Sequence, residues 1–377
     1  MKKVFLLLSF IILAAGSAEA FETSARNAIL IDFETGTYLF SKNEADQMPP
    51  ASMSKLMTVY IIFDKLKSGL LSLDDEFTVS ENAWRKGGAA SGGSTMFLKI
   101  DESVKIDDLL RGIIVQSGND ACIVAAENIA GSEEDFAVLM NETAQKLGLK
   151  NSVFANSTGL PDENQLMSAE DLALLARAII KEFPEYYHIF QEKEFTHNGI
   201  KQGNRNPLLY SMSGADGLKT GHTEEAGFCL TGSAVKNGRR LIEVIAGLDS
   251  NKARSDEAER LMSYGFREFK NYKLFEKGAV VGSVDVFYGQ PHQVDLVIPE
   301  DVVKTLKKNQ PKEKTVKLIY NAPIKAPVKK GAVLGQIEIT LEGGEKEYVD
   351  IVAANDVAKV GFIKRMIENA RYYLKGK

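Results

Sequence analysis

The chain has 377 residues, of which 44% are hydrophobic and 26% are charged, and this composition is ordinary for a soluble globular protein. Its length suffices for two domains, with a large apolar core in at least one of them. The net charge of -5 at pH 7 argues against the basic class of proteins that bind nucleic acid, so no nucleic-acid partner is expected.

The first twenty residues differ from the rest of the chain. MKKVFLLLSFIILAAGSAEA begins with two lysines, continues as an apolar run, and ends in the small-x-small pattern AEA. This arrangement is typical of a secretory signal peptide that is cleaved before Phe21. A membrane-spanning helix needs about 20 apolar residues, so the run is too short for one. We therefore predict that residues 1–20 are a signal peptide and that the protein is exported. Export combined with only two cysteines suits a protein of the bacterial envelope.

The first half of the mature chain is predicted to be mostly helical. RNAILIDFETGTYLF, residues 26–40, predicts a β-hairpin around a Glu-Thr-Gly turn. From about 52 to 190, apolar residues recur at spacings of three and four, and Asp, Ser or Gly stand at the ends of the runs, which predicts helices. KGGAASGGST, residues 86–95, lacks the lysine placement and the preceding strand of a phosphate-binding loop, so we interpret it as a flexible loop.

From residue 216 the chain reads as strands. AGFCLTGSAV and RLIEVIAGL flank Lys236-Asn237-Gly238, which is a strong hairpin signal. DGLKTGHT immediately precedes this hairpin and is expected to form a strand at one edge of the same sheet. RSDEAERLMSYGFREF then predicts a helix. Over residues 21–270 these elements predict an α+β fold, in which an antiparallel sheet is packed with helices.

Beyond residue 274 the chain changes again. Short apolar strands separated by Pro, Gly and Lys clusters predict a small all-β domain over residues 271–355. The tail, residues 356–377, predicts an amphipathic helix. Its apolar face would carry Val360, Ile363, Met366, Ile367, Ala370, Tyr373 and Leu374, and its other face Lys364, Arg365, Glu368, Arg371 and Lys375.

Two locations are open for this tail helix. A cationic amphipathic helix can lie on an anionic membrane surface, or it can pack on its own domain. We favour the membrane surface because the all-β domain separates the tail from the main core.

The chain has two cysteines, Cys122 and Cys229, so it carries no disulfide framework. In an oxidising compartment the two could pair. Cys122 falls in a predicted helix and Cys229 in a predicted strand, and their separation cannot be derived from the sequence. We favour two buried thiols.

The stretch PPASMSKLMTVYI places Lys55 three residues after Ser52, at the start of an apolar helix. Residues at i and i+3 share a helix face, so the two side chains can come within hydrogen-bonding distance. A serine hydroxyl becomes an effective nucleophile when a neighbouring base takes its proton, and lysine can do so only when burial or a nearby cation lowers its pKa. The pattern alone is weak, because S-x-x-K recurs at Ser233 and Lys236, where it runs into the predicted hairpin turn.

Two further motifs lie downstream. QSGNDAC places Ser117 and Asn119 at the entry to an apolar helix, where both residue types are also ordinary N-caps. DGLKTGHT contains the sequence Lys219-Thr220-Gly221, in which a lysine and a hydroxyl could clamp a carboxylate and the glycine would allow close approach of a ligand. Each motif alone also suits a purely structural role.

Taken in order, S-x-x-K, S-x-N and K-T-G form the motif set of class A β-lactamases and penicillin-binding proteins. SMSK, SGNDAC, DGLKTGHT and NGIKQGNRNPLLY resemble the versions found in the D-alanyl-D-alanine carboxypeptidases of low molecular mass. The resemblance covers residues 21 to about 270, and the all-β domain and the tail fit the carboxypeptidase subgroup. It implies a β-lactamase/transpeptidase-like fold, a peptidoglycan stem peptide as substrate, acylation by β-lactam antibiotics, and no cofactor or metal.

The resemblance also implies roles for the residues of the three motifs. Ser52 would be the nucleophile and Lys55 its base, and Ser117 would relay a proton to the leaving amine. Asn119 would orient Lys55 and the substrate amide, and the tail would bind the outer face of the cytoplasmic membrane.

The remaining implied roles concern substrate binding. The backbone N–H groups of Ser52 and His222, which follows Gly221, would form the oxyanion hole, and Lys219 with Thr220 would bind the terminal carboxylate. Arg254 matches the family arginine that binds the same carboxylate, although it could equally be an ordinary residue of a helical first turn. The other histidines are scattered along the chain, so neither a Ser-His-Asp triad nor a zinc cluster is evident.

Three competing functions fit the sequence less well. A class A β-lactamase would carry a deacylating glutamate in an E-x-x-L-N setting, which residues 162–166 do not reproduce. A DD-endopeptidase shares the motifs but usually lacks the all-β domain. A catalytically silent wall-binding protein is disfavoured because all three motifs are intact.

Overall fold

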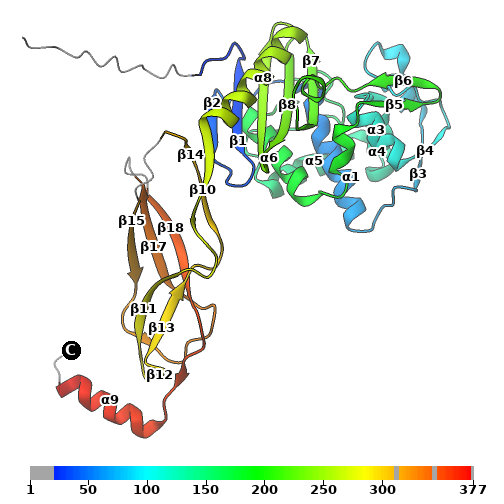
Figure 1. Cartoon of the computed structure of the whole chain (residues 1–377). Coiled ribbons are helices and arrows are strands. Elements are labelled where there is room, and N and C mark those ends of the chain that lie inside the picture. The colour runs from blue at the N-terminus through cyan, green and yellow to red at the C-terminus, as the bar shows by residue number, and fades with distance from the viewer. Residues whose placement is uncertain (1–20, 310–313, 342–345, 375–377) are drawn as a thin grey trace, which may run out of the picture.

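The computed structural model describes residues 21–309, 314–341 and 346–374 of the chain. The predicted signal peptide therefore lies outside the described residues. The molecule is elongated: a rounded part made of helices and a sheet carries a narrow all-β part, and the C-terminal helix lies at the far end of the latter (Figure 1).

The rounded part is built on a five-stranded antiparallel sheet in the order β2-β1-β9-β8-β7. Its strands are β1 (Asn27–Asp32), β2 (Tyr38–Lys42), β7 (Ala215–Thr223), β8 (Gly227–Lys236) and β9 (Arg239–Leu248). Both predicted hairpins are confirmed by the β1–β2 and β8–β9 pairings. The strand that carries the K-T-G sequence is at the edge of the sheet, as predicted.

Turn chemistry fixes the β8–β9 hairpin. Asn237 and Gly238 have φ of 52° and 75°, the positive values that a tight hairpin turn of the I′ type requires at both central positions. Successive residues of β9 point to opposite faces, and both faces are buried. Ile242 and Val244 join the larger core beneath the helices, whereas Leu241 and Ile245 join a smaller core on the other face.

Helices cover both faces of the sheet (Figure 1). α8 (Asn251–Glu268) packs on the smaller core through Ala258, Leu261 and Met262. The larger core is enclosed by α1 (Lys55–Lys67), α2 (Glu81–Gly87), α3 (Ile106–Ile114), α4 (Asn119–Ala130), α5 (Glu133–Leu147) and α6 (Ala169–Glu182). Serine hydroxyls cap the N-termini of α2, α5, α6 and α8 by accepting a hydrogen bond from a backbone N–H in the first turn.

Short elements complete the rounded part. They are the 3₁₀ helices η1 (Ala51–Ser54), η2 (Ala89–Ser91) and η3 (Tyr187–Gln191), the helical turn α7 (Leu208–Ser211), and the strand pairs β3 (Glu76–Thr78) with β4 (Ser103–Lys105) and β5 (Glu194–His197) with β6 (Ile200–Gly203). KGGAASGGST, which we interpreted as a flexible loop, ends α2 and includes η2.

The narrow part consists of strands around its own apolar core. A ribbon of β10 (Phe269–Phe275) and β14 (Val302–Lys307) leads into a six-stranded sheet in the order β15-β17-β18-β13-β11-β16, accompanied by the β12–β19 pair. The remaining strands are β11 (Val280–Phe287), β12 (Gly289–Gln290), β13 (Gln293–Val297), β15 (Lys314–Tyr320), β16 (Ile324–Lys325), β17 (Val333–Leu341), β18 (Lys346–Ala353) and β19 (Ala358–Lys359). The predicted fold class, an α+β antiparallel sheet packed with helices and followed by a small all-β domain, is confirmed.

Polar contacts join the two parts where the β1–β2 turn meets the β10–β14 ribbon. The buried carboxylate of Asp32 accepts hydrogen bonds from Arg239 Nε at 2.8 Å and from Asn271 Nδ2 at 3.2 Å. Thr305 Oγ1 donates to Asn271 Oδ1 and lies 2.7 Å from Thr35 Oγ1. Because these groups come from both parts, they tie the ribbon to the five-stranded sheet at a defined place.

The C-terminal helix begins later than predicted. α9 covers Phe362–Leu374, whereas we expected helix throughout the tail from residue 356. Val357 forms a bridge with Val328, and β19 pairs with β12. Val357 and Val360 are buried, so burial in the all-β core holds this stretch extended, and the helix starts only after Gly361.

Both cysteines are free and buried, as we favoured. Within the part of the chain that the structure describes, no helix combines the length and the apolar character needed to cross a membrane.

Candidate active site

Ser52 and Lys55 lie at the junction of η1 and α1, beneath one end of the five-stranded sheet. Ser52 belongs to the 3₁₀ turn Ala51–Ser54, and Lys55 is the first residue of α1. Lys55 Nζ lies 2.9 Å from Ser52 Oγ, so the i, i+3 spacing brings the two groups together as predicted. Ser52 is partly exposed, whereas Lys55 is completely buried, so the hydroxyl is accessible and its neighbour is shielded from water.

Three oxygen atoms surround the amine of Lys55. Besides Ser52 Oγ, Nζ contacts Asn119 Oδ1 at 2.8 Å and the backbone carbonyl of Thr158 at 2.5 Å. None of these acceptors is a carboxylate, and burial lowers the pKa of Lys55 to about 8. A substantial fraction of the amine is therefore neutral near physiological pH, which is the form that can accept a proton.

Ser117 and Asn119 reach the same place from α4. Asn119 is the first residue of that helix, and Ser117 stands just before its N-cap with φ of 61°. Lys219 Nζ, from β7, donates a hydrogen bond to Ser117 Oγ at 2.9 Å. Burial, followed by the charges of Lys55 and Arg205, lowers the pKa of Lys219. Ser117 therefore contacts the lysine of the K-T-G sequence, whereas Asn119 contacts the lysine of the S-x-x-K sequence.

Position 221 of the K-T-G sequence requires glycine for a steric reason. A Cβ at Gly221 would lie 2.9 Å from the carbonyl oxygen of Pro50 and 3.1 Å from Ala51 Cβ. Strand β7 therefore presses directly on the turn that carries Ser52, and any larger residue would force the two apart. This contact brings Lys219, Thr220 and Ser52 to one site, although they are more than 160 residues apart in sequence.

A cleft of about 350 Å³ opens over Ser52. Its walls come from the serine turn, the glycine-rich loop, the start of α4, the loop after Thr158, and the end of β7; the lining residues are Ser52, Gly92, Gly93, Ser94, Asn119, Gly159, Leu160, Arg205, His222 and Thr223. The glycine-rich segment thus forms one wall of the cleft. Its Ser94 carbonyl accepts a hydrogen bond from the backbone N–H of Asn119 at 2.8 Å, which holds that wall against α4.

The sequence reasoning missed Arg205, Ser94 and Thr158 as members of the site. Arg205 Nη1 donates to Ser94 Oγ at 2.5 Å across the cleft. Burial lowers the pKa of Arg205. Arg205 lies within NGIKQGNRNPLLY, so the segment carried a signal, but nothing in it distinguished the arginine from its neighbours.

Arg254 and His222 occupy different positions relative to the cleft. His222 lines the cleft and its ring stacks on Phe228 with 3.9 Å between centroids. Arg254 is buried, its guanidinium carbon lies 5.8 Å from the centre of the Phe228 ring, and it donates to Asn251 Oδ1 and to the backbone carbonyl of Arg205. The structure therefore brings seven of the predicted residues together around Ser52, whereas Arg254 is not among the residues that line the cleft.

The site concentrates positive charge. Lys55, Lys219 and Arg205 converge on it, and Arg254 lies near enough to lower the pKa of Lys219 further. Such an arrangement favours an anionic ligand, and a nucleophile with an adjacent neutral amine suits acyl transfer.

Comparison with known proteins agrees with this chemistry. Residues 14–250 match the family described as D-alanyl-D-alanine carboxypeptidase, and residues 269–359 match the C-terminal domain of penicillin-binding protein 5. The chain is 39% identical to the D-alanyl-D-alanine carboxypeptidase DacC of Escherichia coli (strain K12), over 96% of this chain and 92% of that protein.

Two matches from Haemophilus influenzae, one in sequence and one in structure, give a consistent result. Its D-alanyl-D-alanine carboxypeptidase DacA is 37% identical, over 97% of this chain and 95% of that protein. The crystal structure of its penicillin-binding protein 5 superposes with a TM-score of 0.84 at 36% identity, and the match covers 91% of this chain and all of that one.

Proposed function

Since this chain belongs to the D-alanyl-D-alanine carboxypeptidase family and is a serine carboxypeptidase, we propose that Ser52 is its nucleophile and Lys55 its general base. The single observation that carries this assignment is the contact of a fully buried lysine amine with an accessible serine hydroxyl at 2.9 Å. In the neutral form the amine has a lone pair that can take the hydroxyl proton as the oxygen attacks.

The acylation step then follows from the contacts. Ser52 Oγ bonds to the carbonyl carbon between the two terminal D-alanines, and its proton passes to Lys55. The carbon–nitrogen bond breaks, and the departing amine takes a proton from Ser117 Oγ, which Lys219 contacts at 2.9 Å. The proton that Lys55 accepted then replaces the one that Ser117 gave up, so both groups regain their starting forms. Free D-alanine leaves, and a stem peptide shortened by one residue remains as an ester of Ser52. Lys55 then takes a proton from water as the water oxygen attacks the ester carbon. The ester carbon–oxygen bond breaks and this proton passes to Ser52 Oγ, which releases the peptide and restores the hydroxyl.

The remaining residues would bind the negatively charged groups of the substrate or orient the base. We assign the backbone N–H groups of Ser52 and His222 to the oxyanion that forms during attack. Lys219 and Thr220 would bind the terminal carboxylate, as the convergence of cations on this site supports. Arg254, whose guanidinium donates to the backbone carbonyl of Arg205, would add positive charge near the cleft, and Arg205 is a further cation on the cleft wall. Asn119 Oδ1, at 2.8 Å from Lys55 Nζ, would orient the base.

A substrate assay tests this function. Residues 21–377 are incubated with a pentapeptide ending in D-Ala-D-Ala, and we expect stoichiometric release of free D-alanine. Fluorescent penicillin should label the chain, and mass spectrometry should place the adduct on the tryptic peptide that contains Ser52. Cleavage of cross-linked dimers without release of D-alanine would instead identify an endopeptidase, and rapid turnover of the penicillin would identify a β-lactamase.

We further propose that the chain is exported, with residues 1–20 as the signal peptide. In this arrangement residues 21–270 form the catalytic domain, residues 271–355 a spacer domain, and residues 356–377 a peripheral anchor on the outer face of the cytoplasmic membrane. The elongated shape, with α9 at the end remote from the catalytic domain, supports this division (Figure 1).

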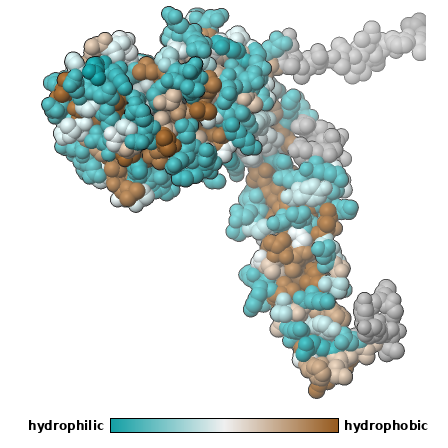
Figure 2. Space-filling model, turned by 180° about the vertical axis from the view of Figure 1, so that it is seen from behind, coloured by the Kyte–Doolittle hydropathy of each residue, from teal (hydrophilic) through white to brown (hydrophobic). Residues whose placement is uncertain are grey.

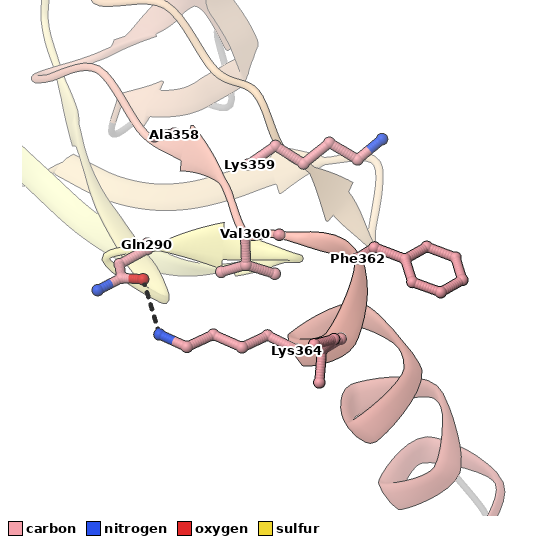
Figure 3. A pocket seen from close by; sticks show the side chains of 8 residues that line it. Gln290, Ala358, Lys359, Val360, Phe362 and Lys364 are labelled. Atoms are coloured by element: carbon pink, nitrogen blue, oxygen red, sulfur yellow. Dashed lines mark hydrogen bonds between the residues drawn. The ribbon is translucent and has the colours of Figure 1, made fainter.

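The anchor is supported by exposed apolar side chains on α9. Phe362, Ile363, Met366 and Ile367 are 68%, 75%, 58% and 49% exposed. Figure 2 shows apolar surface at the far end of the all-β part, where this helix begins. Phe362 and Lys364 point to opposite sides of the helix start, and Lys364 Nζ contacts Gln290 Oε1 at 3.3 Å beside a hollow lined by residues 358–364 (Figure 3). Apolar residues that lie in water on an otherwise soluble domain suit burial in a lipid interface.

Removal of α9 should therefore release the protein from membranes. We expect a chain that ends at Gly361 to remain in the supernatant when it is centrifuged with vesicles containing phosphatidylglycerol, while the full chain sediments. The cut spares β19, so the all-β domain keeps its pairing with β12. A second variant, Ile363→Ser with Met366→Ser, keeps the length of the helix but removes two of its exposed apolar side chains. It should also bind the vesicles more weakly than the full chain does. Equal sedimentation of all three proteins would refute the anchor, and D-alanine release from a soluble peptide should be unchanged in each.

A further inference from the structure

The loop that follows α5 packs along the face of α1 that carries Lys55. Thr58 Oγ1, one turn after Lys55, donates to the backbone carbonyl of Ser157 at 2.7 Å. The next carbonyl, that of Thr158, accepts from Lys55 Nζ at 2.5 Å. Two consecutive carbonyls thus dock on two residues at i and i+3, and both contacts are buried.

A carboxylate at the start of α5 holds this loop in place. Glu133, the first residue of α5, accepts hydrogen bonds from Ser157 Oγ at 2.8 Å and from the backbone N–H of Ser157 at 3.3 Å. Ser157 is completely buried, so its hydroxyl depends on this partner. Gly159 allows the loop to pack closely against the turn that carries Ser52. Its φ is 79°, and a Cβ there would lie 2.0 Å from the carbonyl oxygen of Ala51.

We propose that Glu133 is a positioning residue for acyl transfer, which fixes the Thr158 carbonyl against Lys55 through Ser157 and so aims the amine at Ser52. This inference rests on the proposed role of Lys55 as the base. A neutral amine has two N–H donors and one lone pair. When the carbonyl of Thr158 and Oδ1 of Asn119 accept both donors, the lone pair is left to face Ser52 Oγ.

The charge of Glu133 adds a second, separable effect. Burial has the largest influence on the pKa of Lys55 and lowers it, and the negative charge of Glu133 acts in the opposite direction. The ionisable groups that face Lys55 from the surrounding elements are Cys122, Arg205, Asp120, Glu133 and Lys219. Loss of the Glu133 charge alone should therefore lower the pKa of Lys55 and shift the acid limb of acylation to lower pH.

Two substitutions separate position from charge. Glu133→Gln keeps an oxygen that can accept from Ser157, so we expect an unchanged plateau rate of penicillin acylation with an acid limb shifted to lower pH. Glu133→Ala removes both, and we expect the plateau rate to fall about 10-fold, because misplacement of a catalytic group is costly even over short distances. Ser157→Ala should cause a similar loss, and the double variant should lose no more than the larger single loss.

Glu134→Ala is the matched control, since it removes an exposed carboxylate from the same helical turn. It should leave both the rate and the limb unchanged. The inference is overturned if both Glu133 variants show the plateau acylation rate and the acid limb of the wild type. It is also overturned if Glu134→Ala loses as much acylation rate as Glu133→Ala. If Glu133→Ala fails to fold, the plateau rate of Ser157→Ala decides instead, and a wild-type plateau in that variant overturns the inference. Acylation of Lys55→Met at the wild-type rate would instead overturn the proposed base. If Lys55→Met loses acylation as expected while both Glu133 variants acylate like the wild type, only this inference is overturned.

Discussion

Replacement of Ser52 by alanine should abolish both D-alanine release and covalent penicillin binding. Among the described residues, Ser52 carries the only hydroxyl that hydrogen-bonds to the amine of Lys55, since Ser117 Oγ contacts Lys219 instead. Loss of the nucleophile from an acyl-transfer site typically reduces turnover by roughly 10⁴-fold or more. Turnover of the D-Ala-D-Ala pentapeptide and in-gel fluorescence after penicillin labelling measure the two effects.

The variant should remain folded, since Ser52 is partly exposed and its side chain contacts only Lys55 among the hydrogen bonds of the described residues. A thermal unfolding midpoint close to that of the wild type is the required control. Release of D-alanine at the wild-type rate by folded Ser52→Ala would refute the nucleophile, and retained penicillin labelling would do so independently.

Replacement of Lys55 by methionine should cause the second large loss of activity. Methionine fills the same buried space without an amine, so acylation by penicillin should fall by between about 10²- and 10⁴-fold, the usual contribution of a general base. The midpoint of thermal unfolding should change little, because loss of a buried amine with a depressed pKa favours the fold, whereas Asn119 Oδ1 and the Thr158 carbonyl lose a hydrogen-bond donor. Stopped-flow measurement of the second-order acylation rate gives the magnitude.

Lys236 provides the matched control for this experiment. It ends the second S-x-x-K sequence of the chain, but it is exposed at the β8–β9 turn, so Lys236→Met should acylate normally. Acylation of the Lys55 variant at the rate of this control would show that another group takes the proton.

The pH dependence follows from the same lysine. Burial lowers the pKa of Lys55 to about 8, and the neutral amine is the form that accepts a proton. The acylation rate of the free enzyme should therefore fall as pH drops below about 8, and it should level off above this value. A rate that rises towards acid pH would contradict the assignment.

Local patterns predicted the fold and the centre of the site well. The spacing of Ser52 and Lys55 needs only a helical turn, and the Asn237-Gly238 turn needs only the φ values those residues adopt. The order of three motifs then indicated that Ser117 and Lys219 would join them, and the two do meet at 2.9 Å.

The missed features depend on tertiary contacts. Thr158 acts through its backbone carbonyl, which any residue possesses, so its side chain carries no signal. Glu133 reads as an ordinary acidic residue of a helical first turn, and its bond to Ser157 spans a loop of unpredictable path. The late start of α9 has the same origin, because apolar periodicity cannot tell that Val357 and Val360 belong to the all-β core.

The polar cluster around Asp32 has a consequence for where the enzyme can work. Arg239 and Asn271 both contact this carboxylate, so the ribbon leaves the catalytic domain in a fixed direction instead of trailing as a loose tether. If α9 rests on a membrane, the cleft is held at a set height above the lipid. The enzyme would then trim those stem peptides that lie in a thin layer of the wall at that height, and the length of the all-β domain would decide which layer is processed.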